Sequence, residues 1–136
     1  MLIEEIIALL LANDPLAQLV GTNVFDTAFP RQSPLPSPAI VCRIVSSRPT
    51  YTSDGPTKQN ATVVQFDIHG TKEEVRGVRD ELAALLQDYR GDLSAGSRVQ
   101  STIWEMDADE SYEHSMSPTA VTYHIMCQAR FVWLTN

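Results

Sequence analysis

The chain of 136 residues lacks several features that mark common classes of protein, and each absence excludes something. It has only two cysteines, Cys42 and Cys127, without Cys-x-x-Cys spacing, so both are expected to be small buried side chains. Its apolar run from Ile6 to Ala12 is too short to span a bilayer, which predicts no membrane association. The first residues, Met-Leu-Ile-Glu-Glu, include two acidic side chains where a secretory signal has basic ones. A cytoplasmic protein is expected.

Basic residues are also scarce. Ten Lys and Arg stand against 17 Asp and Glu, which gives a formal net charge of -7. Such a charge repels phosphate backbones and disfavours sequence-reading nucleic-acid binding or docking on anionic membranes. The hydrophobic content of 43% is enough for one continuous core, and the length suits one domain over residues 1–136.

Catalytic and metal-binding motifs are absent as well. Neither a Gly-x-Gly-x-x-Gly nor a Gly-Lys-Ser/Thr phosphate loop occurs, and Ser94 lies outside any Gly-x-Ser-x-Gly elbow. The acidic segment from Asp107 fails as a calcium loop, because Tyr112 and Pro118 stand where the sharp turn and the bidentate Glu belong. The residues alone therefore supply no recognisable catalytic, cofactor-binding or metal-binding motif, and the segment from Asp107 is expected to be a solvated acidic loop that can contact another protein.

Two helices are predicted from apolar spacing. The first runs from Leu2 to Leu11 and is expected to stop at Asn13-Asp14-Pro15. The second begins at a Thr71-x-x-Glu74 capping box and is expected to continue to Tyr89, with Gly91 closing its last turn. The intervening Gly21 to Pro38 is rich in proline, so we expect an extended, irregular connection there.

Four strands are predicted from alternation and β-branched content. They cover residues 39–47, 61–69, 98–106 and 121–133. The last is the clearest, because its odd positions from Val121 to Trp133 are apolar while the even positions are mixed. The sequence therefore predicts an α+β fold with an antiparallel, mainly four-stranded sheet and two helices packed on one face.

Residues on the polar face of this sheet support a second interpretation, in which the protein has a catalytic or binding role. Asp67, His69 and His124 are predicted to share this face, where they could serve a small enzyme, a ligand-binding domain or a two-histidine metal site. In the third strand, Trp104 and Met106 are expected on the face opposite Val99 and Ile103, which would suit a subunit interface or an edge strand under a loop.

Two connections between strands are longer than hairpin turns need. Long loops in a compact domain are often functional, so both are candidate contact segments. We interpret Arg48 to Asn60 as an arm and Asp107 to Ser117 as a second contact loop. The residues proposed for assembly contacts are Arg48, Tyr51, Asp54, Gly55, Pro56, Asp107, Asp109, Glu110 and Tyr112.

The order of these features resembles a known family. An acidic amphipathic helix leads into Asn-Asp-Pro-Leu-Ala-Gln-Leu-Val-Gly, and a proline-rich passage leads into Ala-Ile-Val-Cys-Arg-Ile-Val. Pro-Thr-Tyr-Thr-Ser-Asp-Gly-Pro then precedes Val-Val-Gln-Phe-Asp-Ile, and Tyr-Arg-Gly follows the Glu-Glu-Val-Arg helix before Val-Gln-Ser-Thr-Ile-Trp-Glu. Over nearly its whole length the chain looks like a tail completion protein of long-tailed bacteriophages and prophages, the tail terminator or head-to-tail joining protein.

The resemblance implies a structural virion protein that is not an enzyme and has no cofactor. It implies a homo-oligomer, a hexameric ring that caps the tail tube protein, joins the head-tail connector protein and lets DNA pass without specific binding. It further implies a place in the virion tail after assembly in the host cytoplasm. Another ring-forming head-completion or tail-tube component is the alternative within the same structural class.

Overall fold

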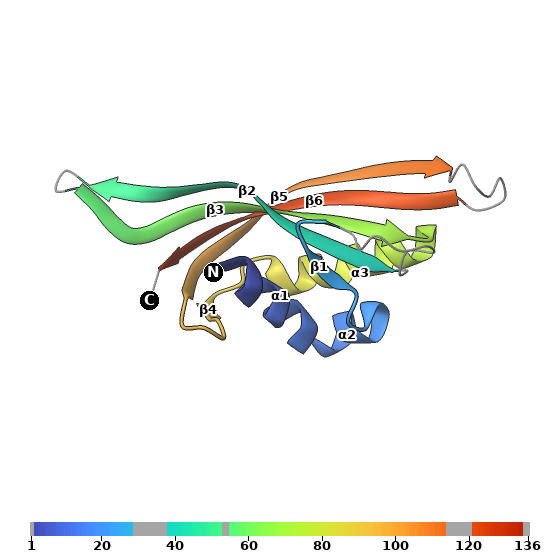
Figure 1. Ribbon diagram of the computed structural model, residues 1–136, viewed down its shortest axis with the longest axis horizontal. Coiled ribbons are helices and arrows are strands. Elements are labelled where there is room, and N and C mark those ends of the chain that lie inside the picture. Colours follow the sequence, from blue (N-terminus) through green and yellow to red (C-terminus); the bar gives the residue numbers. More distant parts are fainter. Residues whose placement is uncertain (1, 29–37, 53–54, 114–120, 135–136) are drawn as a thin grey trace.

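The computed structural model describes residues 2–28, 38–52, 55–113 and 121–134. It has helices and strands in an α+β arrangement (Figure 1). The helices are α1 (Leu2–Ala12), α2 (Asp14–Val20) and α3 (Lys72–Leu86). The strands are β1 (Val24–Asp26), β2 (Ala39–Thr52), β3 (Gly55–Gly70), β4 (Gly91–Asp92), β5 (Arg98–Glu113) and β6 (Val121–Leu134).

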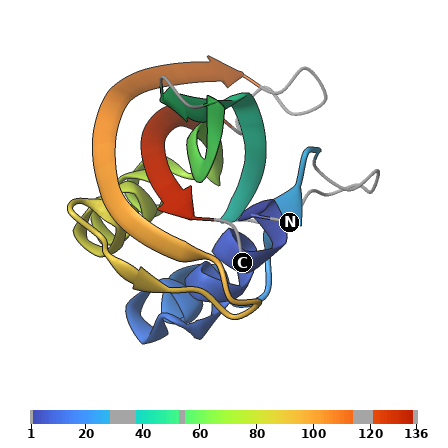
Figure 2. The ribbon, with the colours of Figure 1, turned by 90° about the vertical axis from the view of Figure 1, so that its left-hand side faces the viewer.

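The sheet has six strands in the order β1-β2-β3-β6-β5-β4. β1 runs parallel to β2, and every other pair is antiparallel. The prediction of an α+β fold is confirmed, but the four-stranded antiparallel sheet is wrong in detail, because β1 and β4 add a short flanking strand to each side. The sheet is strongly curled, so its strands trace arcs when seen end-on (Figure 2).

A third helix, α2, corrects the expected stop after α1. Asn13 does not only end α1: its side chain accepts a hydrogen bond from the backbone N–H of Leu16 at 3.1 Å and so caps α2. Pro15 fits because the first turn of a helix needs no backbone donor there. The Asn-Asp-Pro sequence therefore ends α1 and also begins α2.

The beginning of α3 is as predicted, and its end is not. Thr71 Oγ1 accepts from the Glu74 N–H at 3.3 Å, and Glu74 Oε1 accepts from the Thr71 N–H at 3.0 Å, which completes the capping box. The helix ends at Leu86 rather than Tyr89, and Asp88 takes the positive φ of 60° that we had expected at the helix end from Gly91. Gly91 instead begins β4.

The core lies between the helices and one face of the sheet (Figure 1). The alternation predicted for β6 is confirmed, since Ile125, Cys127, Ala129 and Phe131 are all buried. Both cysteines are buried, as expected, and they form no disulfide bond. The fully buried side chains of the helices and of β3 complete this core, namely Ile6, Leu10, Leu16, Val78, Leu82, Leu86, Val64, Phe66 and Ile68.

The two long connections are hairpins rather than loops, which corrects the sequence prediction. β2 and β3 stay paired from Ala39↔His69 to Thr52↔Gly55, and β5 and β6 stay paired out to Glu113↔Val121. The two hairpins point toward opposite ends of the molecule, and the β2–β3 hairpin reaches well beyond the part that the helices cover (Figure 1). The fold is therefore a helical layer under a sheet whose β2–β3 hairpin extends past it.

Two irregularities in β5 reverse part of the predicted alternation. The register shifts between Val99 and Ser101 and again between Trp104 and Met106. A bulge adds one residue to one strand, so positions beyond it change faces. Trp104 accordingly packs against the core together with Val99, and Ile103 is 54% exposed, contrary to the expected grouping of Val99 with Ile103.

A buried carboxylate ties the N-terminal helix to the connection before β5. Glu5 is only 4% exposed. Its Oε2 accepts from the N–H groups of Ala95 at 3.1 Å and Ser97 at 3.2 Å, and its Oε1 accepts from Ser97 Oγ at 2.6 Å. This one side chain thus fixes the β4–β5 connection to α1.

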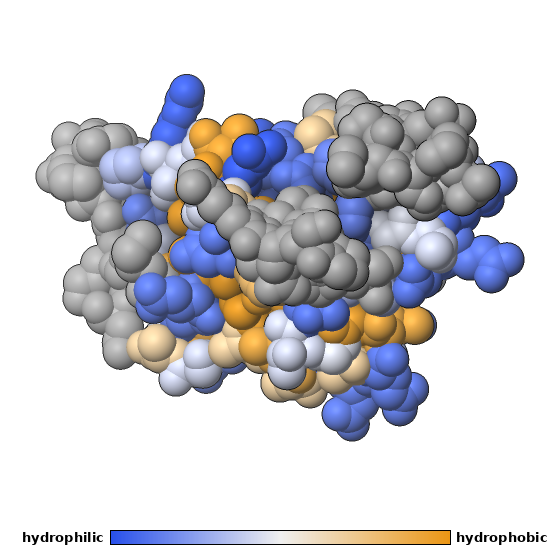
Figure 3. Space-filling model, turned by 45° about the vertical axis from the view of Figure 1, so that its right-hand side comes forward, coloured by the Kyte–Doolittle hydropathy of each residue, from blue (hydrophilic) through white to orange (hydrophobic). Residues whose placement is uncertain are grey.

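On the face that Figure 3 shows, hydrophobic residues reach the surface in several areas among hydrophilic ones. None of the helices in the described part of the chain is both long enough and apolar enough to cross a membrane.

Candidate functional site

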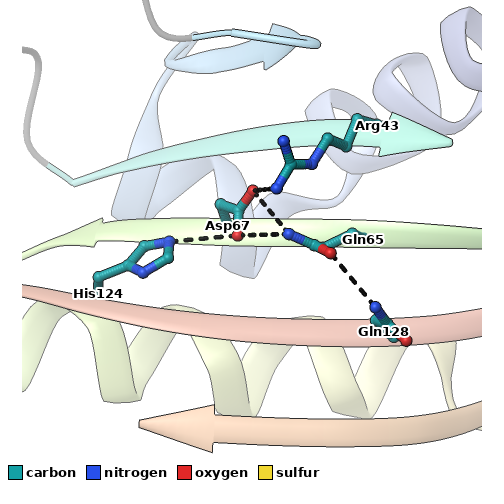
Figure 4. A network of polar contacts seen from close by, with 5 residues as sticks. All are labelled: Arg43, Gln65, Asp67, His124 and Gln128. Atoms are coloured by element: carbon teal, nitrogen blue, oxygen red, sulfur yellow. Dashed lines mark hydrogen bonds and ion pairs between the residues drawn. The ribbon is translucent and has the colours of Figure 1, made fainter. Parts of the chain in front are cut away.

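A network of polar side chains lies on the sheet face opposite the helices (Figure 4). Asp67 is its centre: its Oδ1 lies 3.2 Å from His124 Nε2, and its Oδ2 lies 3.4 Å from Arg43 Nη2. Gln65 Nε2 donates to both carboxylate oxygens of Asp67, at 3.0 and 3.2 Å, and Gln65 Oε1 accepts from Gln128 Nε2 at 3.3 Å. The network joins β2, β3 and β6.

The strand register explains why these residues meet. Arg43, Gln65 and Gln128 stand side by side across three strands, as Arg43↔Gln65 and Gln65↔Gln128 partners. Asp67 is two residues further along β3 and therefore on the same face. The predicted meeting of Asp67 with His124 is confirmed, and His69 is the register partner of His124 on the neighbouring strand.

The Asp67 carboxyl is held in its charged form. Burial by itself raises the pKa of Asp67, but hydrogen bonds from His124 and Gln65 and the positive charge of Arg43 outweigh burial and lower the pKa below 3.8. Neighbouring Cys42 shows the opposite effect: burial first, and then the charges of Asp26 and Asp67, raise the pKa of its thiol far above the usual value. Cys42 is therefore a protonated core residue rather than a nucleophile.

This arrangement fits a structural role better than a catalytic one. Both oxygens of Asp67 already accept from groups of the same chain, so the carboxylate is satisfied inside the fold. Every buried polar side-chain atom in the described part of the chain has a hydrogen-bond partner. Within that same part, no group of three His, Cys, Asp or Glu side chains is placed to hold a metal ion.

The first predicted contact segment is the outer half of the β2–β3 hairpin. Arg48 is exposed and pairs with Ala61, and Tyr51 pairs with Pro56 close to the Thr52↔Gly55 end of the ladder. Asp54 lies outside the described residues. The described part of the arm expected between Arg48 and Asn60 is thus a pair of antiparallel strands.

The second predicted segment is the outer half of the β5–β6 hairpin. Asp107 pairs with Cys127, Asp109 with Ile125, Glu110 with His124 and Tyr112 with Thr122. The structure does not bring this segment together with the first, because the two hairpins point to opposite ends (Figure 1). The rest of the proposed contact loop, residues 114–117, lies outside the described residues.

A shallow hollow of about 470 Å³ shares no residue with the polar network. It is lined by Arg90, Gly91, Arg98, Val99, Gln100 and Leu134. Of its two arginines, Arg90 directly precedes β4 and Arg98 begins β5, and neither was predicted to be part of a site.

Sequence reasoning did not include three members of the network among its candidates. Arg43, Gln65 and Gln128 occupy the polar positions of alternating strands, and that signal was available. Their pairing depends on the register of β2 against β3 and of β3 against β6, which the sequence alone does not fix.

Comparisons with known proteins place the chain in a family. Residues 4–133 match the model of the family described as Tail completion protein gp17. A chain from the solved structure titled "Virion of native gene transfer agent (GTA) particle" is similar with a TM-score of 0.67 and 16% sequence identity, covering 95% of this chain and 92% of that chain. At this identity the structural likeness shows a shared fold alone. No curated protein matches the sequence.

The family match spans all three helices and almost the whole sheet, which agrees with the resemblance inferred from the order of sequence features. The chain therefore belongs to the family of Tail completion protein gp17, and it is a structural protein of the bacteriophage virion tail.

Proposed function

We propose that this protein assembles as a hexameric ring that caps the end of the tail tube and joins the tail to the head connector. The family match over residues 4–133 carries this proposal. The two hairpins support it, because a ring that contacts a tube on one side and a connector on the other needs projections in two directions (Figure 1). The protein would act in the virion tail after assembly in the host cytoplasm.

The acidity of the chain has a use in such a ring. A net charge of -7 on each copy multiplies around a closed ring. Carboxylates at the inner wall repel the phosphate backbone, so DNA can slide through the opening without adhering. This passage needs no base-specific contact.

The β2–β3 arm is the first part to test. Replacing residues 50–59 with Asn-Gly joins the register partners Pro49 and Asn60 through a two-residue turn. The change leaves intact the hydrogen bond from Trp133 Nε1 to buried Thr62 Oγ1 at 2.9 Å. We expect a melting temperature within a few degrees of the unaltered protein and a loss of ring formation or tail joining.

The assay combines native mass spectrometry with negative-stain imaging of purified tail tubes. The unaltered protein should form a ring on the tube end, and the truncated protein should leave the tube bare. Capped tubes with the truncated arm would refute its role in assembly. Binding of the unaltered protein to connectors but never to tubes would make it a head-completion component instead.

The acidic segment of β5 gives a second test. Reversing Asp107, Asp109 and Glu110 to lysine should disturb docking or DNA passage, because it replaces three negative charges by positive ones. The matched control reverses three exposed acids at other sites, namely Glu73, Asp80 and Asp92. Equal effects of the two triple variants would assign the result to net charge alone, against a specific contact.

A further inference from the structure

The outer edges of β2 and β5 are unpaired over most of their length in the described part of the chain. On the β2 side, the last bond to the neighbouring segment runs from the Thr27 N–H to the Cys42 carbonyl at 2.8 Å. On the β5 side, β4 covers only Arg98 and Val99, and the Asp88 N–H reaches the Thr102 carbonyl at 3.3 Å. Beyond these points we define the β2 edge as residues 43–52 and the β5 edge as residues 103–113.

Unpaired strand edges present a row of free N–H and C=O groups that can pair with another strand. Pro49 lacks an N–H and interrupts such a ladder, and the register against β3 shifts between Ile44 and Ser46, so the β2 edge before Pro49 contains one irregularity, at Val45. Natural proteins usually shorten or cover such edges. Here both edges belong to the projecting hairpins, where no helix lies against them (Figure 1).

Exposed apolar side chains gather on these same two edges. The described large hydrophobic residues with high exposure include Ile44 at 38% and Val45 at 52% on the β2 edge, and Ile103 at 54% on the β5 edge. The other two, Leu11 and Leu19, are on helices. A free backbone ladder beside exposed apolar side chains is the combination that strand addition between chains uses.

The charges of the edges select the partner. The β2 edge carries Arg43 and Arg48 and no acid, whereas the β5 edge carries Glu105, Asp107, Asp109, Glu110 and Glu113 and no base. Pairing two β2 edges or two β5 edges would oppose like charges, which destabilises a sheet. Pairing a β2 edge with a β5 edge avoids this repulsion and places Arg48 opposite an acidic strand, whereas Arg43 and Glu105 already pair within the chain with Asp67 and Arg130.

We propose that the β2 edge of one copy pairs with the β5 edge of the next copy, so that the sheets of neighbouring copies become continuous. This inference rests on the proposed ring. Within one sheet β2 and β5 run in opposite directions, since the order β2-β3-β6-β5 contains three antiparallel pairings. The contact between copies is therefore antiparallel, and it is head-to-tail, the type that closes into rings.

Two substitutions block one edge each. Val45→Lys places a charge on the exposed apolar part of the β2 edge, and Ile103→Lys does the same on the β5 edge. Each variant alone should lose the wild-type oligomer in native mass spectrometry. An equimolar mixture should form a one-to-one heterodimer and nothing larger, because one intact β2 edge and one intact β5 edge remain. Leu19→Lys, at 39% exposure on α2, is the matched control and should assemble like wild type.

Chemical cross-linking detects the same contact if rings of this protein form only on tail tubes. Val45→Cys and Ile103→Cys in one chain, joined by a short bis-maleimide, should give covalent multimers, while the native Cys42 and Cys127 are buried and do not compete. If each lysine variant still formed rings like those of the wild type, the edge pairing would be wrong but the proposed ring would stand. Homodimers of Ile103→Lys would overturn the edge pairing in favour of a β2–β2 contact. The absence of both oligomers and cross-links, with or without tubes, would overturn the edge pairing and the ring together.

Discussion

Removal of the Glu5 carboxylate should destabilise the fold far more than its place near the start of a helix suggests. In Glu5→Ala the buried Ser97 N–H loses its acceptor, which costs about 1–3 kcal/mol, whereas the partly buried Ala95 N–H can turn to water. Loss of one buried methylene group adds roughly 0.8 kcal/mol. We expect a total of about 2–4 kcal/mol, a large share of the roughly 5–15 kcal/mol by which domains are stable.

Glu5→Gln separates charge from shape. The amide keeps the methylene groups and one oxygen that accepts from the two backbone N–H groups, and its nitrogen can donate to Ser97 Oγ. Only the charge assistance is lost, so the expected cost is about 1–2 kcal/mol. Glu4→Ala, at an exposed position one residue earlier, should stay within about 0.5 kcal/mol of wild type.

The measurement is urea unfolding of the three variants, followed by tryptophan fluorescence and circular dichroism with comparison of m-values. Hydrogen exchange of the Ser97 amide gives a local readout, because its protection should fall in Glu5→Ala before global unfolding does. A cost below 1 kcal/mol for Glu5→Ala, or equal costs for the alanine and glutamine variants, would refute the reasoning that the buried acceptor holds the β4–β5 connection.

Three further predictions concern the network, the thiols and the α3 cap. The lowered pKa of Asp67 stabilises the fold above pH 3.8, and this contribution is lost as the pH falls through the folded-state pKa. Urea unfolding of Asp67→Asn and wild type at several pH values should therefore show a difference in stability that shrinks as the pH falls below 3.8. A difference that stays constant with pH would contradict the lowered pKa. Cys42 and Cys127 should react with a thiol reagent only after unfolding, and rapid labelling of the native protein would disprove their burial. Thr71→Ala should cost about 1 kcal/mol in urea unfolding through loss of the capping box, and an unchanged midpoint would show that α3 is held by packing alone.

The sequence predicts those parts of the fold whose local pattern has one structural solution. The alternation of β6 and the Thr71 capping box are such patterns, because a half-buried strand and a helix start each need them. The end of α3 was wrong because Gly91 is the usual residue at positive φ, whereas Asp88 adopts that conformation here.

The hairpins were missed because their outer halves carry residues typical of loops. Aspartate and glutamate are depleted in strands, and the run from Asp107 to Glu113 is rich in both. Its strand structure comes from pairing with β6, a partner that only the tertiary fold provides. The polar network could be predicted in part for the same reason: the faces of Asp67 and His124 follow from alternation, but the addition of Arg43 follows from register.

The contact between Glu5 and Ser97 also constrains when the protein can fold. It joins residues separated by 92 positions, and the central β3–β6 pairing joins Asn60 to Trp133. The β2–β3 hairpin can form early because its partners are close in sequence, and α1 can pack on α2, β1 and β2 as soon as they leave the ribosome. The Glu5 carboxylate, in contrast, has to wait for the Ser97 and Ala95 donors, so its burial is a late step of folding.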